Sequence, residues 1–277
     1  MRNSLIILCF LSLTWVNLIS GRSVDQDAPV LTDVEKLSRL EFLEKQNLEY
    51  KERLSEYEKS DCQMFKNSSD IYIVYLPGIE PFAAPCESRI EDGGWTVIQR
   101  RLEGNINFQR SWNEYREGFG DLRGDFFIGL EKLHRMTTAH TQELLVFYER
   151  SLLETTQEIY RNFLIGSEQE EYVLKSAKSN GLLGFRGTIG KKFSTYDRDN
   201  DEYWLDNCAK IYNGGWWFGK CIPEVVASNP NGPYLPEVTS KSRGIVFAGF
   251  KGIRAVQMMI RPQRKEDKKD PFGLKWE

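Results

Sequence analysis

The chain has 277 residues, of which 40% are hydrophobic and 13% aromatic, so it predicts one large or two small globular domains rather than a disordered chain. Its 37 basic and 40 acidic residues give a net charge of −3. This balance lacks the basic stripe of nucleic-acid-binding proteins and a polybasic membrane patch, so neither nucleic acid nor a membrane surface is an expected partner.

Residues 1–20 predict a secretory signal peptide. Arg2 supplies a positive charge, and a largely apolar stretch runs from Leu5 to Ile19. This stretch is shorter than the roughly 20 apolar residues that a membrane-spanning helix needs. We therefore expect a secreted, extracellular protein without a membrane span, with an uncleaved signal anchor as the alternative.

Two sequence features depend on secretion. Four cysteines remain after removal of a signal peptide: Cys62, Cys86, Cys208 and Cys221. An even number in a secreted protein indicates two disulfide bonds, with three possible pairings, of which pairing between sequence neighbours is the simplest. The second feature is the sequon Asn67-Ser68-Ser69, at which we predict an N-linked glycan.

Residues 30–59 predict a helix that self-associates. The segment contains neither Gly nor Pro and is rich in Glu, Lys and Leu. Six residues occupy the a and d positions of a heptad repeat: Leu40, Leu43, Asn47, Tyr50, Leu54 and Tyr57. A homo-oligomer joined through a short coiled coil is one interpretation. A solvated helix lying on the globular domain is the other, because barely three heptads make a weak zipper alone.

From Cys62 onward the sequence turns globular. Apolar runs around Pro and Gly predict strands within four segments: 71–82, 93–101, 141–149 and 170–175. Residues 110–119 predict a helix with Trp112 and Tyr115 on one face. Residues 263–277 form a charged tail.

An acidic loop follows, in which Asp197, Asp199 and Asp201 occupy alternate positions. Alternating carboxylates can surround a hard cation with oxygen atoms, as Ca²⁺ requires. An EF-hand is excluded, because Glu202 and Cys208 stand where its Gly and its last Glu belong. Two interpretations remain: a different calcium loop completed by backbone carbonyls, or a solvated acidic turn.

The other conspicuous residues predict structure rather than catalysis. Trp216 and Trp217 could form a platform for sugars, but tryptophan is mostly buried, so we expect them in the core. The chain has only two histidines, His134 and His140, and it lacks a nucleophile motif of the G-x-S-x-G type. We therefore predict that the protein is not an enzyme.

Ordered motifs extend over residues 62–262. They are Asp92-Gly93-Gly94-Trp95, Phe108-Gln109-Arg110-Ser111-Trp112, Gly118-Phe119-Gly120, Phe193-Ser194-Thr195, Asn207-Cys208-Ala209, Trp216-Trp217, Asn231-Gly232 and Ile260-Arg261-Pro262. With these motifs the protein resembles the fibrinogen-related proteins, which carry a fibrinogen C-terminal globular domain. The resemblance implies an α+β fold with a twisted, mostly antiparallel sheet and a loop-rich binding subdomain, preceded by a short coiled-coil helix.

The resemblance also implies two disulfide bonds and a metal site within the domain. It implies disulfide bonds between Cys62 and Cys86 and between Cys208 and Cys221. It further implies a calcium site that uses the carboxylates of Asp199 and Asp201 and backbone carbonyls near Tyr203 and Leu205. The segment from Asp201 to Cys208 is one residue longer than is usual in the family, so the carbonyl ligands differ most from the pattern.

The resemblance points to two functions. Lectin members such as ficolins and tachylectins recognise acetyl groups beside the calcium loop, and Tyr212 matches their pocket tyrosine. Ile222 replaces the usual histidine, and Lys241 with Ser242 stands where a tyrosine is expected. We predict a calcium-dependent lectin for acetylated or other glycans on microbial or cell surfaces, of the innate-immunity type. The altered pocket supports the alternative, an angiopoietin-like protein ligand for a cell-surface receptor.

Overall fold

The computed structural model describes residues 32–57, 61–76, 78–151, 154–179, 184–221, 228–235 and 244–263. It divides into a first unit up to Leu54 and a second unit from Ser55 onward. The segments predicted as signal peptide, residues 1–20, and as charged tail lie outside the described residues, except that Gln263 is described. None of the described helices is both long enough and apolar enough to span a membrane.

The described part of the first unit belongs to the helix α2 (Asp33–Tyr57), which agrees with the helix predicted over residues 30–59. Thr32 caps it, because its hydroxyl accepts from the Glu35 N–H while the Glu35 carboxylate accepts from the Thr32 N–H. Leu40 and Leu43, which we assigned to a and d positions, are about half exposed. The single chain therefore leaves these apolar side chains in contact with water.

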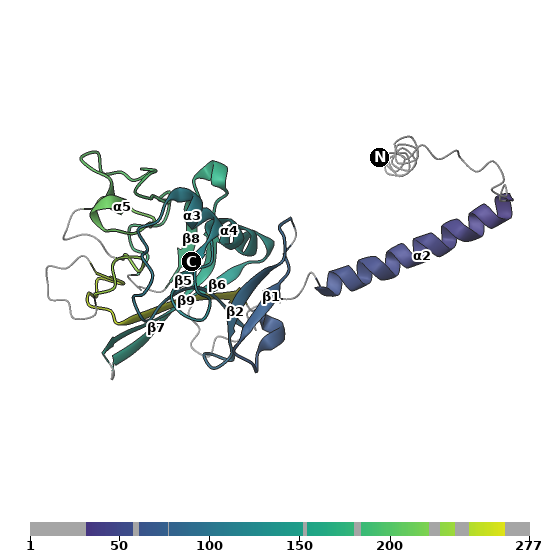
Figure 1. Cartoon of the computed structure of the whole chain (residues 1–277), viewed down its shortest axis with the longest axis horizontal. Coiled ribbons are helices and arrows are strands. Elements are labelled where there is room, and N and C mark those ends of the chain that lie inside the picture. Colours follow the sequence, from purple (N-terminus) through teal and green to yellow (C-terminus); the bar gives the residue numbers. More distant parts are fainter. Residues whose placement is uncertain are drawn as a thin grey trace, which may run out of the picture. The chain divides into compact units, whose positions relative to one another are not determined.

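A nine-stranded sheet forms the centre of the second unit (Figure 1). Its main path has the order β1-β2-β3-β9-β6-β7-β8, and β4 and β5 pair beside β3. Every pair between these strands is antiparallel. The strands are β1 (Ile71–Val74), β2 (Phe82–Glu87), β3 (Trp95–Arg101), β4 (Phe119–Gly120), β5 (Phe126–Phe127), β6 (Gln142–Ser151), β7 (Glu154–Ile165), β8 (Leu174–Lys178) and β9 (Ala255–Pro262).

Short helices accompany the sheet. They are the 3-10 helices η1 (Cys62–Phe65) and η2 (Glu168–Glu170) and the α-helices α3 (Trp112–Glu117), α4 (Leu130–Ala139) and α5 (Cys208–Ile211). The helix α4 packs against β7 and α3, whereas α5 lies among loops (Figure 1). In α3, Ser111 and Glu114 form a capping box, and Trp112 and Tyr115 are buried as their spacing predicted.

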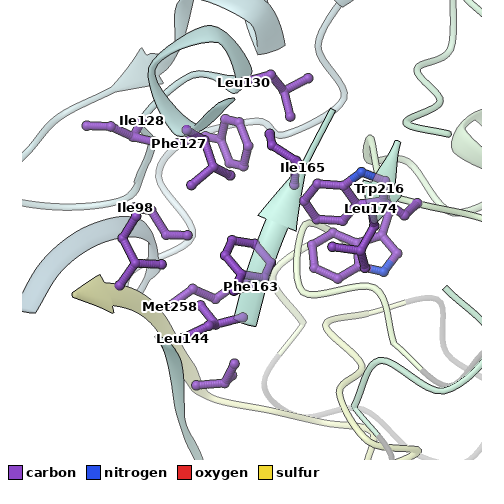
Figure 2. Packing of buried hydrophobic residues seen from close by; sticks show 14 of the residues in the cluster. Ile98, Phe127, Ile128, Leu130, Leu144, Phe163, Ile165, Leu174, Trp216 and Met258 are labelled. Carbon is purple, nitrogen blue, oxygen red and sulfur yellow. The ribbon is translucent and has the colours of Figure 1, made fainter. Parts of the chain in front are cut away.

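The core gathers residues from strands far apart in the sequence. Figure 2 shows Ile98 of β3, Leu144 of β6 and Met258 of β9 in one packed cluster, which also contains Phe127, Phe163 and Trp216. Trp216 and Trp217 are both about 99% buried, so they belong to this core and form no exposed sugar platform. The prediction that Trp216 and Trp217 lie in the core is confirmed.

One strand prediction is partly wrong. Residues 170–175 do not form a continuous strand, because β8 begins only at Leu174. Glu171 and Tyr172 adopt positive φ angles of 54° and 47°, a left-handed conformation that is incompatible with a strand. A hydrophobic run thus includes a tight turn that brings Tyr172 into the core.

Both disulfide bonds have the pairing that the resemblance implied. Cys62 and Cys86 join η1 to β2, and Cys208 and Cys221 join α5 to the loop that follows the tryptophan pair. Each bond connects Cα atoms 5.4 Å apart. Asn67 is exposed in the turn after η1, which is compatible with the predicted glycan.

Candidate functional site

The acidic loop is anchored to the rest of the domain by its polar residues. The carboxylate of Asp197 accepts from the Trp112 N–H at 2.9 Å and from the Thr195 hydroxyl at 2.7 Å. Asn200 donates from its side chain to the Phe193 carbonyl at 2.8 Å. Asp197 therefore stabilises the start of α3, and the first acid of the motif is a structural residue.

Hydrogen bonds of Asn207 hold the C-terminal end of the acidic loop in place. The Asn207 side chain donates to the Thr195 carbonyl at 2.9 Å and accepts from the Lys210 N–H at 3.0 Å, which caps α5. The disulfide bond of Cys208 with Cys221 follows directly. The intervening residues are thus held between two fixed points.

Asp199 and Asp201 lie close together in this held segment. The two carboxylate oxygens of Asp201 accept from the Tyr203 N–H and from the Cys208 N–H, each at 2.8 Å. One oxygen of Asp199 lies 3.3 Å from the Asp201 nitrogen. Burial raises the pKa of Asp201 to about 6, and the negative charge of Asp199 adds to this rise, although both backbone hydrogen bonds oppose it.

A cavity of about 520 Å³ opens beside these acids. Its wall includes all four residues predicted as metal ligands: Asp199, Asp201, Tyr203 and Leu205. No group of three or more His, Cys, Asp or Glu side chains that could hold a metal occurs in the described part of the chain. An ion here would need backbone carbonyls and water as its other ligands.

The positions of the Asp199 and Asp201 carboxylates are compatible with a bound Ca²⁺, for an electrostatic reason. Burial and the neighbouring carboxylate both disfavour the charged form of Asp201, and a cation would offset both effects. Each carboxylate oxygen has two lone pairs, so the oxygens that accept backbone N–H groups can still contact an ion. Asp199 and Asp201 would then hold the ion through their carboxylates.

The same loop carries an apolar pair, Trp204 and Leu205, whose exposure the sequence did not predict. Trp204 is 87% exposed and Leu205 is 59% exposed, and both line the cavity wall. They lie in the segment between Asp201 and Cys208. An indole this exposed beside charged residues is unusual in a single folded chain, since tryptophan is mostly buried.

Of the four residues predicted to bind a ligand, Tyr212 lies in the described part of the chain. The Tyr212 hydroxyl donates to the Cys221 carbonyl at 3.2 Å, and its ring stacks on that of Phe218 at an interplanar angle of 25°, with centroids 5.9 Å apart. The other three predicted ligand-binding residues, Ile222, Lys241 and Ser242, lie outside the described residues. Their role stays a prediction.

Beneath the loops a buried network links β3 to residues 230–232. Arg101 donates to the Gly232 carbonyl at 2.6 Å, and Gln99 donates to the Asn231 side-chain oxygen at 3.1 Å. Asn231 in turn donates to the Gly215 carbonyl at 2.9 Å, next to the tryptophan pair. This network fixes the loop-rich region on the sheet, and no local sequence pattern predicts it because its partners are about 130 residues apart.

The comparisons with known proteins agree with this architecture. Residues 57–263 match the family model for the C-terminal globular domain of the fibrinogen beta and gamma chains. Angiopoietin-4 of Mus musculus is 36% identical over an alignment of 216 residues, which covers 73% of this chain and 42% of that protein. Angiopoietin-related protein 2 of Homo sapiens is 39% identical over an alignment of 215 residues, which covers 73% of this chain and 43% of that protein.

The chain thus spans about two fifths of the length of these relatives. Among solved structures, the fibrinogen-like globe domain of human ANGPTL2 is 36% identical with a TM-score of 0.67, covering 73% of this chain and 98% of that domain. The protein therefore belongs to the family of the fibrinogen C-terminal globular domain, whose angiopoietin and fibrinogen members are secreted proteins without enzymatic activity.

Proposed function

We propose that the protein is a ligand for a cell-surface receptor, as angiopoietin-like members of the family are. The observation that carries this proposal is the exposed pair Trp204 and Leu205. The identity of the relatives supports it, because angiopoietins and angiopoietin-related proteins are among the matched sequences. Calcium-dependent recognition of acetylated glycans has less support, since Ile222 replaces the usual histidine of the pocket.

The exposed pair has the chemistry of a protein-binding hot spot. Tryptophan is enriched among the few residues that contribute most of the binding free energy in interfaces. The wall around Trp204 and Leu205 also contains Glu202, Asp206 and Lys210, which would form a polar rim. Burial of this apolar pair in a partner would remove it from water without a change in the fold.

We expect Trp204→Ala to weaken saturable binding to receptor-bearing cells by about 30-fold or more, which corresponds to a loss of about 2 kcal/mol at a hot spot. Binding of the labelled secreted protein to a panel of cell lines measures this. Leu102→Ala is the control, because Leu102 is also exposed but lies outside the acidic loop. Unchanged binding of Trp204→Ala would contradict the proposal, and competition by acetylated sugars would favour the lectin function.

We further propose that Ca²⁺ stabilises the loop that presents this pair. Asp199 and Asp201 would provide carboxylate ligands, and Tyr203 and Leu205 would provide backbone carbonyls. The ion would supply the positive charge that two close carboxylates lack. Its role would be to order the binding surface rather than to take part in a reaction.

The calcium proposal predicts a change in melting temperature. With calcium at about ten times its Kd, the gain in stability is about 1.4 kcal/mol, which raises the Tm of a domain of this size by about 4 °C. Differential scanning calorimetry in calcium and in EDTA measures it. Asp201→Asn should abolish the calcium-dependent shift, whereas Asp206→Asn, an exposed acid in the same loop, should keep it. Equal melting temperatures in both buffers would rule out the proposed ion.

The helix α2 would add multivalency through a homo-oligomer. Clustering of weak single sites raises the apparent affinity by roughly 10²–10⁴ when the sites can bind together. The half-exposed Leu40 and Leu43 would be buried between helices. Association would therefore remove from water the apolar side chains that the single chain exposes.

We expect the double variant Leu40→Ser/Leu43→Ser to sediment with the mass of a single chain, because it removes apolar residues from the a and d seam. Analytical ultracentrifugation measures the mass. Leu48→Ser is the control, since Leu48 is similarly exposed but lies outside the a and d positions. A variant without residues 30–59 that kept the parent's oligomeric state would exclude the helix as the assembly element.

A further inference from the structure

The predicted glycosylation site, Asn67, lies exposed in a turn between η1 and β1. It belongs to the only Asn-x-Ser/Thr sequon of the chain. The Ser68 N–H donates to the Phe65 carbonyl at 3.1 Å, and Lys66 has φ −58° and ψ −23°, as in a type I β-turn. Phe65 is the first residue of this turn and Asn67 the third, so their side chains leave the same short segment.

A pair of aromatic rings lies against this turn. The rings of Phe65 and of Tyr72, in β1, are stacked with centroids 3.7 Å apart and an interplanar angle of 8°. The Tyr72 hydroxyl donates to the Ser68 Oγ at 2.6 Å, which fixes the pair beside the residue that follows Asn67. Both aromatic residues are partly exposed. Because each ring covers one face of the other, their exposed surface is on the outer faces and the edges.

The segment after the turn is fixed to β2. The Ser69 hydroxyl donates to the Glu87 carboxylate at 3.1 Å and accepts from the Ser88 N–H at 3.0 Å. The disulfide bond between η1 and β2 fixes the segment before the turn. A sugar on Asn67 would therefore meet a surface that is already ordered, so the contact costs little conformational entropy.

We propose that the first N-acetylglucosamine of a glycan on Asn67 packs on the outer face of Phe65 and stabilises the domain. One face of this sugar presents C–H groups with a partial positive charge, and the face of an aromatic ring is negative, so the two attract each other. The contact also removes part of the exposed ring from water. The glycan is then a structural part of the domain, and this role does not depend on receptor binding.

Enzymatic trimming of the secreted protein tests the role of the first sugar. The protein is made in cells whose N-glycans stay in the high-mannose form. Endoglycosidase H then leaves one N-acetylglucosamine on Asn67, whereas the variant Asn67→Gln carries no glycan. An aromatic contact of ordinary strength corresponds to a Tm shift of about 3 °C in a domain of this size. We therefore expect the trimmed form to melt with the untrimmed protein and Asn67→Gln to melt lower by that amount.

Three results of this experiment would overturn the proposal. The first is peptide mass spectrometry that finds no glycan on Asn67 of the secreted protein. The second is an equal melting temperature for the untrimmed protein, the trimmed form and Asn67→Gln. The third is a trimmed form that melts with Asn67→Gln, because the stabilisation would then come from the outer sugars.

Variants of Phe65 separate stacking from other effects of the glycan. Phe65→Leu keeps an apolar side chain but removes the aromatic face, whereas Phe65→Tyr keeps that face. In Phe65→Leu, we expect the additional Asn67→Gln substitution to change the Tm by at most about 1 °C, and in Phe65→Tyr by as much as in the parent. Met64→Leu is the control, because Met64 is 61% exposed in the same helix but has no ring. An equal loss in Phe65→Leu and in the parent would contradict the stacking.

Discussion

Asp125→Ala is expected to lower the free energy of unfolding by about 3–5 kcal/mol, because it leaves a buried arginine without its counter-ion. Arg101 and Asp125 are both almost fully buried, and the Arg101 Nε atom lies 3.6 Å from an Asp125 oxygen. This distance makes an ion pair but exceeds that of a normal hydrogen bond. Burial lowers the pKa of Arg101, and the Asp125 charge works against this effect.

The Asp125→Ala substitution also removes the carboxylate that accepts hydrogen bonds from the backbone. Asp125 accepts from three successive N–H groups, those of Leu102, Glu103 and Gly104, at 2.6, 3.1 and 2.9 Å. Without the carboxylate, the turn after β3 loses the group that holds it. The same arginine binds the Gly232 carbonyl, so the effect extends to the loop-rich region.

Urea denaturation with both disulfide bonds intact measures the change for Asp125→Ala. The matched control is Asp121→Ala, because Asp121 is exposed and accepts only locally from the Arg123 N–H at 2.9 Å. We expect the control to change stability by at most about 0.5 kcal/mol. Similar small effects for both variants would show that the buried ion pair contributes little.

Trp217→Ala is expected to destabilise the domain by a comparable amount, about 3–5 kcal/mol, the usual range for truncation of a large buried aromatic residue. The Trp217 indole N–H donates to the Tyr172 carbonyl at 2.7 Å. Its ring packs edge-to-face against Phe193 and Trp216, with centroids 5.2 and 4.9 Å apart. Truncation therefore creates a cavity and leaves a buried carbonyl without its donor.

Trp204→Ala is the natural comparison, since it makes the same substitution at an indole that is 87% exposed. We expect its stability to stay within about 0.5 kcal/mol of the parent. Thermal and urea unfolding of the two variants measure the contrast. Equal losses in both variants would mean that Trp217 is not the core residue that its burial indicates.

Local patterns in the sequence predicted the parts of the fold that local physics determines. The spacing of Trp112 and Tyr115 identified α3, because a short helix needs only its own side chains to be recognised. The strand β7 (Glu154–Ile165) was missed, since it mixes exposed polar residues with buried ones and no Gly or Pro marks a turn before it. The resemblance, rather than spacing, decided between the disulfide pairings.

The candidate site likewise has features that the sequence predicts and features that only the structure shows. The acidic motif was visible as a charge pattern, but this pattern does not distinguish the structural role of Asp197 from that of Asp199 and Asp201. Its bond to Trp112 joins residues that are 85 positions apart, and no local pattern indicates such a partner. The exposure of Trp204 likewise depends on the path of the whole loop, so only the structure distinguishes it from the buried tryptophans.

The position of β9 has a consequence for biosynthesis. This strand is hydrogen-bonded to β3 on one side and to β6 on the other, yet the ribosome makes it after all the other strands of the sheet. Until it emerges, the nascent polypeptide has two open strand edges, which are sites of aggregation. A premature stop before Ala255 would therefore leave a product that cannot complete its sheet, and chaperones would need to protect the growing polypeptide until translation passes that residue.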